Sequence, residues 1–184
     1  LEYDPVRDFV PITQLATFEF AIAVGKDIPA TTLAELVAWI RANPEKANYG
    51  MPGAGTLPHF FGAMFARAIG AELQPVAYNG TPALLADLVG GRIPLLFHAT
   101  NELVEMHKAG AIRILATSDR RRSPFLPDVP TFRESTYDLE GTGWYGLFAP
   151  ASTSAETVAR INAIMVGALA RPALRARVLA LRQR

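Results

Sequence analysis

Apolar and polar residues alternate over the first part of the chain. Between Phe9 and Val24 the large apolar side chains fall at even positions: Val10, Ile12, Phe18, Phe20, Ile22 and Val24. Successive side chains of a strand point to opposite faces, so this period of two predicts one long extended segment, or two strands end to end. A capping box formed by Thr32 and Glu35 then opens a helix, which Asn43-Pro44 ends.

The middle of the chain alternates between strand and helix patterns. Short apolar runs predict strands at Asn48–Met51, Leu73–Tyr78, Ile93–Phe97 and Ile112–Ala116. Between them, helical spacing predicts helices at about Leu57–Ile69, from Thr81 to Val89, and over Glu102–Lys108. Strands and helices in alternation predict an α/β sheet with helices on both faces.

Local signals refine two of these helices. The apolar face of the first is expected to consist of Phe60, Phe61, Met64, Phe65 and Ala68, with Gly70 as its C-terminal stop. Thr81 is expected to cap the second, because Pro82 follows it in the position that proline favours.

The last third of the chain changes character. Residues 118–137 read as a long irregular stretch, which contains three consecutive arginines. An apolar strand follows at Gly143–Ala149, and a second capping box, Thr153 with Glu156, opens a helix. The apolar residues of that helix are Val158, Ile161, Ile164, Met165 and Leu169.

Composition narrows the function classes. The 184 residues suit one globular domain or two small ones, and the net charge of +1 argues against a large nucleic-acid footprint. The absence of cysteine excludes disulfides, thiolate metal sites and cysteine nucleophiles. A start at Leu1-Glu2 without Met, and an arginine-rich helical end, predict a piece of a longer protein.

Two junctions between a strand and a helix are suited to an anion. Gly53-Ala54-Gly55-Thr56 follows one predicted strand, and Tyr78-Asn79-Gly80 follows the next. Backbone N–H groups and helix N-termini attract negative charge, and both loops would lie beyond the carboxyl ends of their strands, where ligands bind. The pair predicts a carboxylate or phosphate pocket; the alternative is a plain tight turn and two ordinary helix caps. The glycine spacing matches no nucleotide fingerprint.

The histidines offer candidates without a metal or catalytic pattern. His59 lies in the first turn after the glycine loop, where it either faces the pocket or makes a structural hydrogen bond. His98 ends an apolar strand at the carboxyl edge and is a pocket candidate, whereas His107 is expected at the surface. No nucleophile elbow, paired acid and base, or metal-ligand spacing occurs, so we expect no enzyme activity, cofactor or metal. A small α/β nucleotide- or phosphate-binding module or enzyme stays open as the alternative.

A collinear set of motifs carries a family resemblance. They are Tyr3-Asp4-Pro5, Asn48-Tyr49-Gly50, the Gly53 loop with His59, Tyr78-Asn79-Gly80, Asp87 to Gly91, Ser123-Pro124 with Leu126 to Thr131, and Trp144 to Pro150. Together they resemble the Bug/TctC family, the extracytoplasmic solute receptors of tripartite tricarboxylate transporters.

The resemblance implies a fold, a ligand and partners. It implies an α/β fold similar to type II periplasmic binding proteins, with one complete lobe and part of the second. Residues 1–24 would then be an extended crossing segment, 25–141 the complete lobe, and 142–184 the return strand and C-terminal helices of the incomplete lobe. The family implies a periplasmic receptor that binds a small organic acid and delivers it to a membrane permease, with Phe18 near the cleft floor or in the core. A sensor that partners a signalling protein is the alternative.

The chain departs from the family pattern in ways that matter for ligand and assembly. Relative to the family, it lacks an N-terminal region and the last C-terminal elements. Met51, Asn79 and His98 stand where the family more often has Ser, Lys and Asp. Apolar residues of the crossing segments would lack cover, so self-association is expected through Phe18, Phe20, Ile22, Trp144, Tyr145 and the helix that follows.

Overall fold

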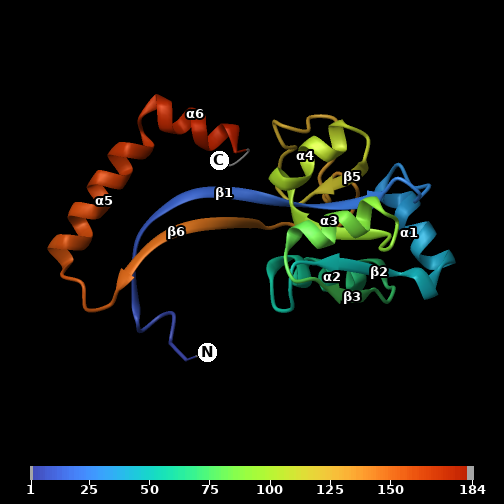
Figure 1. Cartoon of the computed structure of the whole chain (residues 1–184), viewed down its shortest axis with the longest axis horizontal. Helices are drawn as coiled ribbons and strands as arrows, with labels where there is room; N and C mark the ends of the chain where they lie inside the picture. Colours follow the sequence, from blue (N-terminus) through green and yellow to red (C-terminus); the bar gives the residue numbers. More distant parts are fainter. Residues whose placement is uncertain (1, 182–184) are drawn as a thin grey trace. The chain divides into compact units, whose positions relative to one another are not determined.

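The computed structural model describes residues 2–181, in two compact units (Figure 1). One consists of residues up to Phe18 together with those from Gly143 onward, and the other spans Glu19–Thr142. Leu1 and residues 182–184, the outermost residues of the flanking segments expected from the sequence, lie outside the described residues.

The sheet of the Glu19–Thr142 unit mixes parallel and antiparallel pairs. Its strands are β2 (Asn48–Met51), β3 (Gln74–Ala77), β4 (Leu95–Ala99), β5 (Ile112–Thr117) and the second part of β1 (Phe9–Gly25), in the order β3-β2-β4-β1-β5. Strand β2 runs parallel to both β3 and β4, whereas β1 runs antiparallel to β4 and β5. Opposite residues include Phe20 with Ala99, and Ala21 with both His98 and Thr117.

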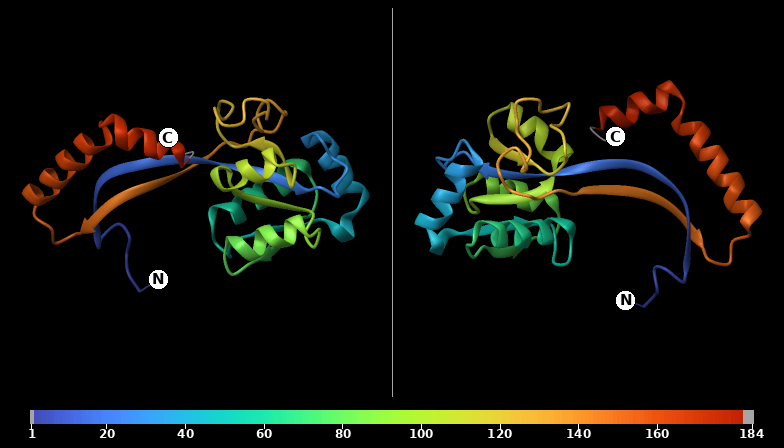
Figure 2. Two further views of the ribbon diagram at one scale, coloured as in Figure 1. Left: turned by 45° about the horizontal axis from the view of Figure 1, so that its top comes forward. Right: turned by 180° about the vertical axis from the view of Figure 1, so that it is seen from behind.

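Both faces of this sheet are covered, which confirms the α/β class. The helices are α1 (Leu33–Ala42), α2 (Leu57–Ile69), α3 (Thr81–Val89) and α4 (Thr100–Lys108), with a short 3-10 turn at Pro44–Lys46 (Figures 1 and 2). Phe61 and Phe65 of α2 contact the rings of Phe20 and Phe97. The alternate positions Ala21, Ala23 and Leu96 belong to a second cluster, with Leu84 and Leu88 of α3 and Leu103 and Val104 of α4.

The start of α1 and the end of α2 match the sequence prediction, but the buried face of α2 does not. Thr32 and Glu35 form the expected capping box, and Gly70 takes the left-handed conformation that ends α2. Phe60 and Met64, expected on the buried face, are 53% and 45% exposed. Gly62 occupies the buried face in their place, and a Cβ there would come within 2.1 Å of the Tyr49 ring. This close approach to β2 sets which side of α2 faces the sheet.

Two predicted caps are wrong. Gly80, at φ 99°, is the N-cap of α3, so Thr81 is the first helical residue and its hydroxyl contacts His98. At α5 (Ala155–Leu169) the N-cap is Ser154, whose hydroxyl oxygen accepts from the Thr157 N–H. The box of Thr153 and Glu156 therefore does not form, because the helix starts one residue later than that box requires.

The other unit has little interior of its own. The first part of β1 pairs with β6 (Thr142–Pro150), and α5 and α6 (Pro172–Ala180) follow. No residue of α5 or α6 within the described part is buried, and Trp144 and Ile164 are 55% and 62% exposed. Phe20 and Ile22, expected to need cover here, are instead buried in the Glu19–Thr142 unit.

Within residues 2–181, no helix is both long enough and apolar enough to cross a membrane.

Candidate ligand-binding site

Three strands deliver the candidate residues to one edge of the sheet. Because β2, β3 and β4 are mutually parallel, their carboxyl ends lie at the same edge. The Gly53–Thr56 loop leaves β2, the Tyr78–Gly80 loop leaves β3, and His98 lies at the end of β4. The backbone N–H of Tyr78 donates to the Met51 carbonyl at 2.9 Å, which ties the first two exits together.

Three helices begin at this edge, and none of them has an N-terminus capped by a side chain. The N-cap positions of α2, α3 and α4 are Thr56, Gly80 and Ala99, and none makes a side-chain cap hydrogen bond. By contrast, α1 and α5 are capped by Thr32 and Ser154. The first N–H groups of a helix have no intrahelical acceptor, so this edge concentrates backbone donors and positive helix ends.

The glycine loop is held by its own hydrogen bonds. Gly53 and Gly55 have φ angles of 128° and 78°, which side chains rarely tolerate. The Thr56 hydroxyl donates to the Gly53 carbonyl at 2.8 Å, and the Gly55 N–H donates to His59 Nδ1 at 3.1 Å. The His59 ring therefore has the structural contact that the sequence left open, and the Gly55 amide is engaged within the loop.

The second loop is anchored through a tyrosine. The Tyr78 hydroxyl donates to Asp87 at 2.9 Å, and Asp87 also forms an ion pair with Arg92. Burial and the neighbouring Asp87 raise the pKa of Tyr78, while the Arg92 hydrogen bond lowers the pKa of Asp87. The phenol is thus a neutral structural group, whereas Asn79 is exposed at the loop tip and Gly80 opens α3.

His98 is buried beneath the start of α3. It is 4% exposed, and its Nε2 lies 3.0 Å from the Thr81 hydroxyl. Nδ1 is buried with no hydrogen-bond partner within residues 2–181. Burial lowers the pKa of His98 more than the nearby Glu102 raises it, so the ring is neutral at pH 7.

His107 is half-buried rather than at the surface, contrary to the sequence expectation. Its Nδ1 accepts the Ile114 backbone N–H at 3.2 Å, and burial lowers its pKa.

Phe18 belongs to the other unit. Its ring packs against Tyr145 at a centroid distance of 4.9 Å and covers Gly143, where a Cβ would approach the ring within 2.3 Å. Its place near a cleft floor stays a prediction.

Sequence reasoning missed several buried polar residues near the end of β4. Glu19 is 5% exposed, and it precedes Phe20, the residue opposite Ala99. Thr100 is 2% exposed, and its hydroxyl has no partner in the described part of the chain. Ser118 is fully buried and joins the Phe20 N–H to the Gly141 carbonyl. A charged residue inside the apolar run of β1 was the available signal for Glu19.

The site offers donors rather than metal ligands. Among the described residues, no cluster of three His, Asp or Glu side chains could hold a metal ion. Glycines and uncapped amides dominate the two loops, and these groups suit an anionic ligand.

Comparison with known proteins gives consistent matches over the whole chain. The sequence profile of the "Tripartite tricarboxylate transporter family receptor" family matches residues 1–181. A protein from the tcbD-tcbE intergenic region of Pseudomonas sp. strain P51 is 33% identical over 172 residues, which cover 92% of this chain and 51% of that protein. The chain spans about half the length of the curated relatives that it matches across most of its length.

Solved structures of binding proteins are also similar. An R. palustris protein with adipate superposes with a TM-score of 0.91 at 28% identity, covering 98% of this chain and 61% of that one. MatC from Rhodopseudomonas palustris, with bound malate, superposes with a TM-score of 0.88 at 27% identity, covering 100% and 63%. The periplasmic binding protein BugD also superposes, with a TM-score of 0.88 at 28% identity, covering 98% of this chain and 61% of that one, so the fold expected from the motifs is confirmed.

Proposed function

The chain belongs to the tripartite tricarboxylate transporter receptor family, as its motifs predicted, and on that premise we propose that it binds a small organic acid through carboxylate groups. The proposal extends to the whole receptor, which would act in the periplasm and deliver its ligand to a membrane permease without chemical change. Two structural neighbours hold the dicarboxylates adipate and malate, which supports this ligand class.

One observation carries the proposal: α2, α3 and α4 all begin at the same sheet edge without side-chain caps. Away from this edge, α1 and α5 are capped by Thr32 and Ser154, whereas α6 begins at Arg171 without a side-chain cap, so it is the meeting of three such ends at one edge that is distinctive. Thr56 does stand at an N-cap, yet its hydroxyl donates to Gly53 instead of accepting from α2. A carboxylate would supply the acceptor that these helix ends lack.

Two buried polar groups lie beside these helix ends. Each uncapped amide N–H can donate to any anion, but the hydroxyl of Thr100 and the Nδ1 of His98 are buried polar atoms without partners in residues 2–181. Such groups favour a ligand, or a bridging water, that completes their hydrogen bonds.

The test adds a charge at the glycine loop. Ala54 is exposed and is the loop residue whose side chain can change without a glycine φ constraint. Ala54→Asp should weaken binding of malate and adipate about tenfold or more by repulsion at the donors, with Ala54→Asn as the neutral control of similar shape. Binding is measured by titration calorimetry, with succinamide as the uncharged ligand control.

Equal affinities of the Asp and Asn variants for the diacids would show that the anion binds elsewhere. Inorganic phosphate in the same titration addresses the phosphate-binding alternative. Tighter binding of phosphate than of any dicarboxylate would favour that alternative over the organic acid.

A further inference from the structure

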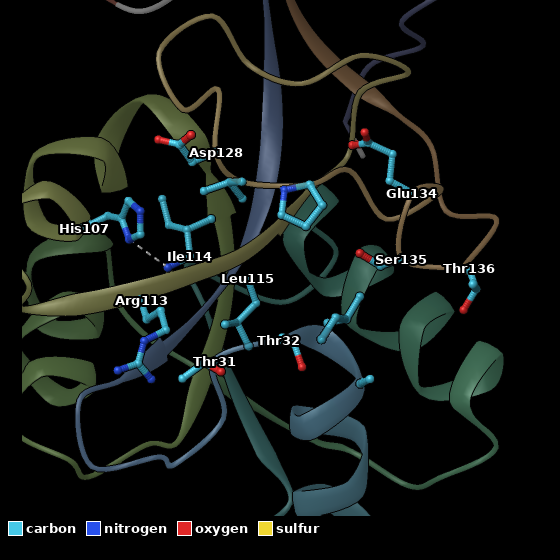
Figure 3. A pocket seen from close by; sticks show the side chains of 14 residues that line it. Thr31, Thr32, His107, Arg113, Ile114, Leu115, Asp128, Glu134, Ser135 and Thr136 are labelled. Carbon is cyan, nitrogen blue, oxygen red and sulfur yellow. Dashed lines mark hydrogen bonds between the residues drawn. The ribbon is translucent and has the colours of Figure 1, made fainter.

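A cavity of about 720 Å³ lies along β5, and hydrogen bonds join its walls to one another (Figure 3). His107 Nδ1 of α4 accepts the backbone N–H of Ile114 at 3.2 Å. The Arg113 guanidinium donates to the Ala30 carbonyl, just before α1, at 2.7 Å. These contacts hold α4 and the start of α1 against β5. The outer face of α2 is different, because its side chains are apolar and remain exposed within residues 2–181.

This outer face of α2 is a continuous apolar stripe. Leu57, Phe60 and Met64 are 49%, 53% and 45% exposed. They are spaced three and four residues apart, so they are neighbours on one side of the helix. Two small exposed residues, Ala63 and Ala68, flank the stripe and leave shallow grooves beside it. Single exposed apolar residues are common, but a contiguous set of them marks an interaction site.

The composition of α2 calls for cover on this side as well as on the side of the sheet. Phe61, Phe65 and Ile69 are buried. Of the 13 residues of the helix, only His59 and Arg67 have polar side chains. A helix at a protein surface normally turns a polar face to water, and a helix that is apolar around its circumference is normally buried. The exposed side of α2 therefore has the composition of a buried one.

The size of the stripe suits a short-lived contact rather than a permanent dimer. A fully exposed side chain of this size presents about 200 Å², so the exposed parts of Leu57, Phe60 and Met64 add up to roughly 300 Å². A stable interface buries about 800 Å² on each partner, and more than half of that area is apolar. The stripe falls short of this requirement.

Arg67 also argues against a second copy of this chain as the partner. It continues the stripe three residues beyond Met64, and its exposed side chain forms no hydrogen bond or ion pair within residues 2–181. Helix α2 contains no acidic residue, and its N-terminus is uncapped. A two-fold pair of α2 helices would place Arg67 against its own copy or against that positive helix end, so like charges would meet. A partner that presents a carboxylate has no such conflict.

The stripe is also linked to the candidate ligand loop. The Gly55 N–H donates to His59 Nδ1 at 3.1 Å, and the His59 ring stacks on Phe60 at a centroid distance of 5.7 Å. A ligand that accepts the Gly55 N–H would release His59, and the Phe60 ring would then lose a fixed neighbour. A partner that contacts Phe60 is thus placed to distinguish a loaded loop from an empty one.

We propose that the exposed face of α2, made of Leu57, Phe60, Met64 and Arg67, is the surface on which the membrane transporter docks. This assignment rests on the proposed function, since a receptor that delivers a ligand needs a short-lived contact with its transporter. The stripe supplies the apolar centre of the contact, and Arg67 supplies a charge at its rim, which the transporter meets with a carboxylate.

The test is photo-crosslinking from Phe60 in the membranes of cells that produce the receptor. With p-benzoylphenylalanine in place of Phe60, irradiation should join the receptor to the membrane subunit of the transporter, identified by mass spectrometry. The same photoreactive residue in place of Lys108, exposed in the last turn of α4, should give at most about a fifth of that yield.

Exposed substitutions then measure how much the stripe contributes. Met64→Gln and Arg67→Glu should each lower the cross-link yield from position 60 about fivefold. Lys108→Glu is the matched control, because it also reverses a positive charge in the last turn of a helix, and it should keep the yield within about twofold. All three variants should bind malate and adipate as the parent does in titration calorimetry.

Several results would overturn the proposal. They are cross-links from position 60 to a second copy of this chain, to another segment of the same polypeptide or to lipid alone, and the absence of any product. Equal yields in Met64→Gln, Arg67→Glu and Lys108→Glu would overturn it as well. A parent chain that binds no carboxylate in the calorimeter would instead contradict the proposed function, so the two failures are told apart.

Discussion

Replacing Thr136 by glycine should stabilise the protein. Residues 132–137 form one helical turn that ends in a left-handed residue: the Tyr137 N–H donates to the Phe132 carbonyl, and the Thr136 N–H to the Arg133 carbonyl. This is the hydrogen-bond pattern in which glycine is preferred at the left-handed position. Thr136 has φ 72°. A non-glycine residue in this conformation destabilises the fold by about 1–2 kcal/mol. Glycine removes that strain, but it destabilises the fold by about 0.5–1 kcal/mol because its unfolded chain has more conformational freedom to lose.

The net expectation for Thr136→Gly is a gain of about 0.5–1 kcal/mol. At roughly 2–4 °C per kcal/mol for a chain of this size, the melting temperature rises by about 1–4 °C. The Thr136 side chain is exposed and has no partner within residues 2–181, so its loss subtracts little. Urea unfolding measures the free energy, and thermal melting gives the independent check.

Gly110 provides the reverse experiment. It has the same φ of 72°, and a Cβ there would meet no atom within 4 Å, so Gly110→Ala isolates the backbone penalty. That variant should lose about 1 kcal/mol. A loss in Gly110→Ala together with no gain in Thr136→Gly would refute the strain argument, because it would mean that Thr136 side-chain contacts compensate for its backbone conformation.

Three further predictions concern the core, pH and association. Gly62→Ala should destabilise by about 1–2 kcal/mol, since its Cβ would overlap the Tyr49 ring, and Tyr49→Leu should make the change nearly neutral in a double-mutant cycle. Burial lowers the pKa of both His98 and His107 in the folded state. Below pH 6.5, about the pKa of a histidine in the unfolded chain, the folded state therefore binds fewer protons than the unfolded state. The stabilisation is therefore full above that pH. It falls as the pH drops toward each folded-state pKa, by up to about 1.4 kcal/mol for each histidine and each pH unit. Urea unfolding midpoints measured from neutral to acid pH should show this slope, and the slope should be smaller in His107→Gln. Sedimentation should show self-association through the exposed face that includes Trp144, and Trp144→Ser should reduce it; a stable monomer at all concentrations would contradict this.

Periodicity and local chemistry predict most of the fold. The capping box at Thr32, the stop at Gly70 and the irregular stretch after β5 all depend on near neighbours in sequence, and each is found. The face of α2 could not be predicted from spacing alone, because phenylalanine at 60 and 61 both fit an apolar stripe. The contact of Gly62 with Tyr49 decides between them, and it joins residues of two different elements.

The candidate site shows the same limit. The glycine loops and their place after parallel strands can be read from the sequence, since the carboxyl ends of parallel strands lie at one edge of a sheet. The engagement of Gly55 by His59, and the burial of His98 under Thr81, depend on side-chain directions that no pattern specifies. Thr81 appeared to be a cap because Thr-Pro is typical of one, but a glycine with φ 99° already held that position.

Strand β1 changes its exposure partway along its length. Up to Phe18 only Ile12 and Ala16 are buried, whereas every residue from Glu19 to Gly25 is buried, where neighbouring strands pair on both sides. Amide hydrogens in one unbroken strand should therefore exchange with solvent at two different rates, with slow exchange confined to the second part. One continuous strand therefore joins a well-buried domain to a segment with little buried surface. Unfolding of the strand that starts at residue 9, by force or by heat, should stop near residue 19.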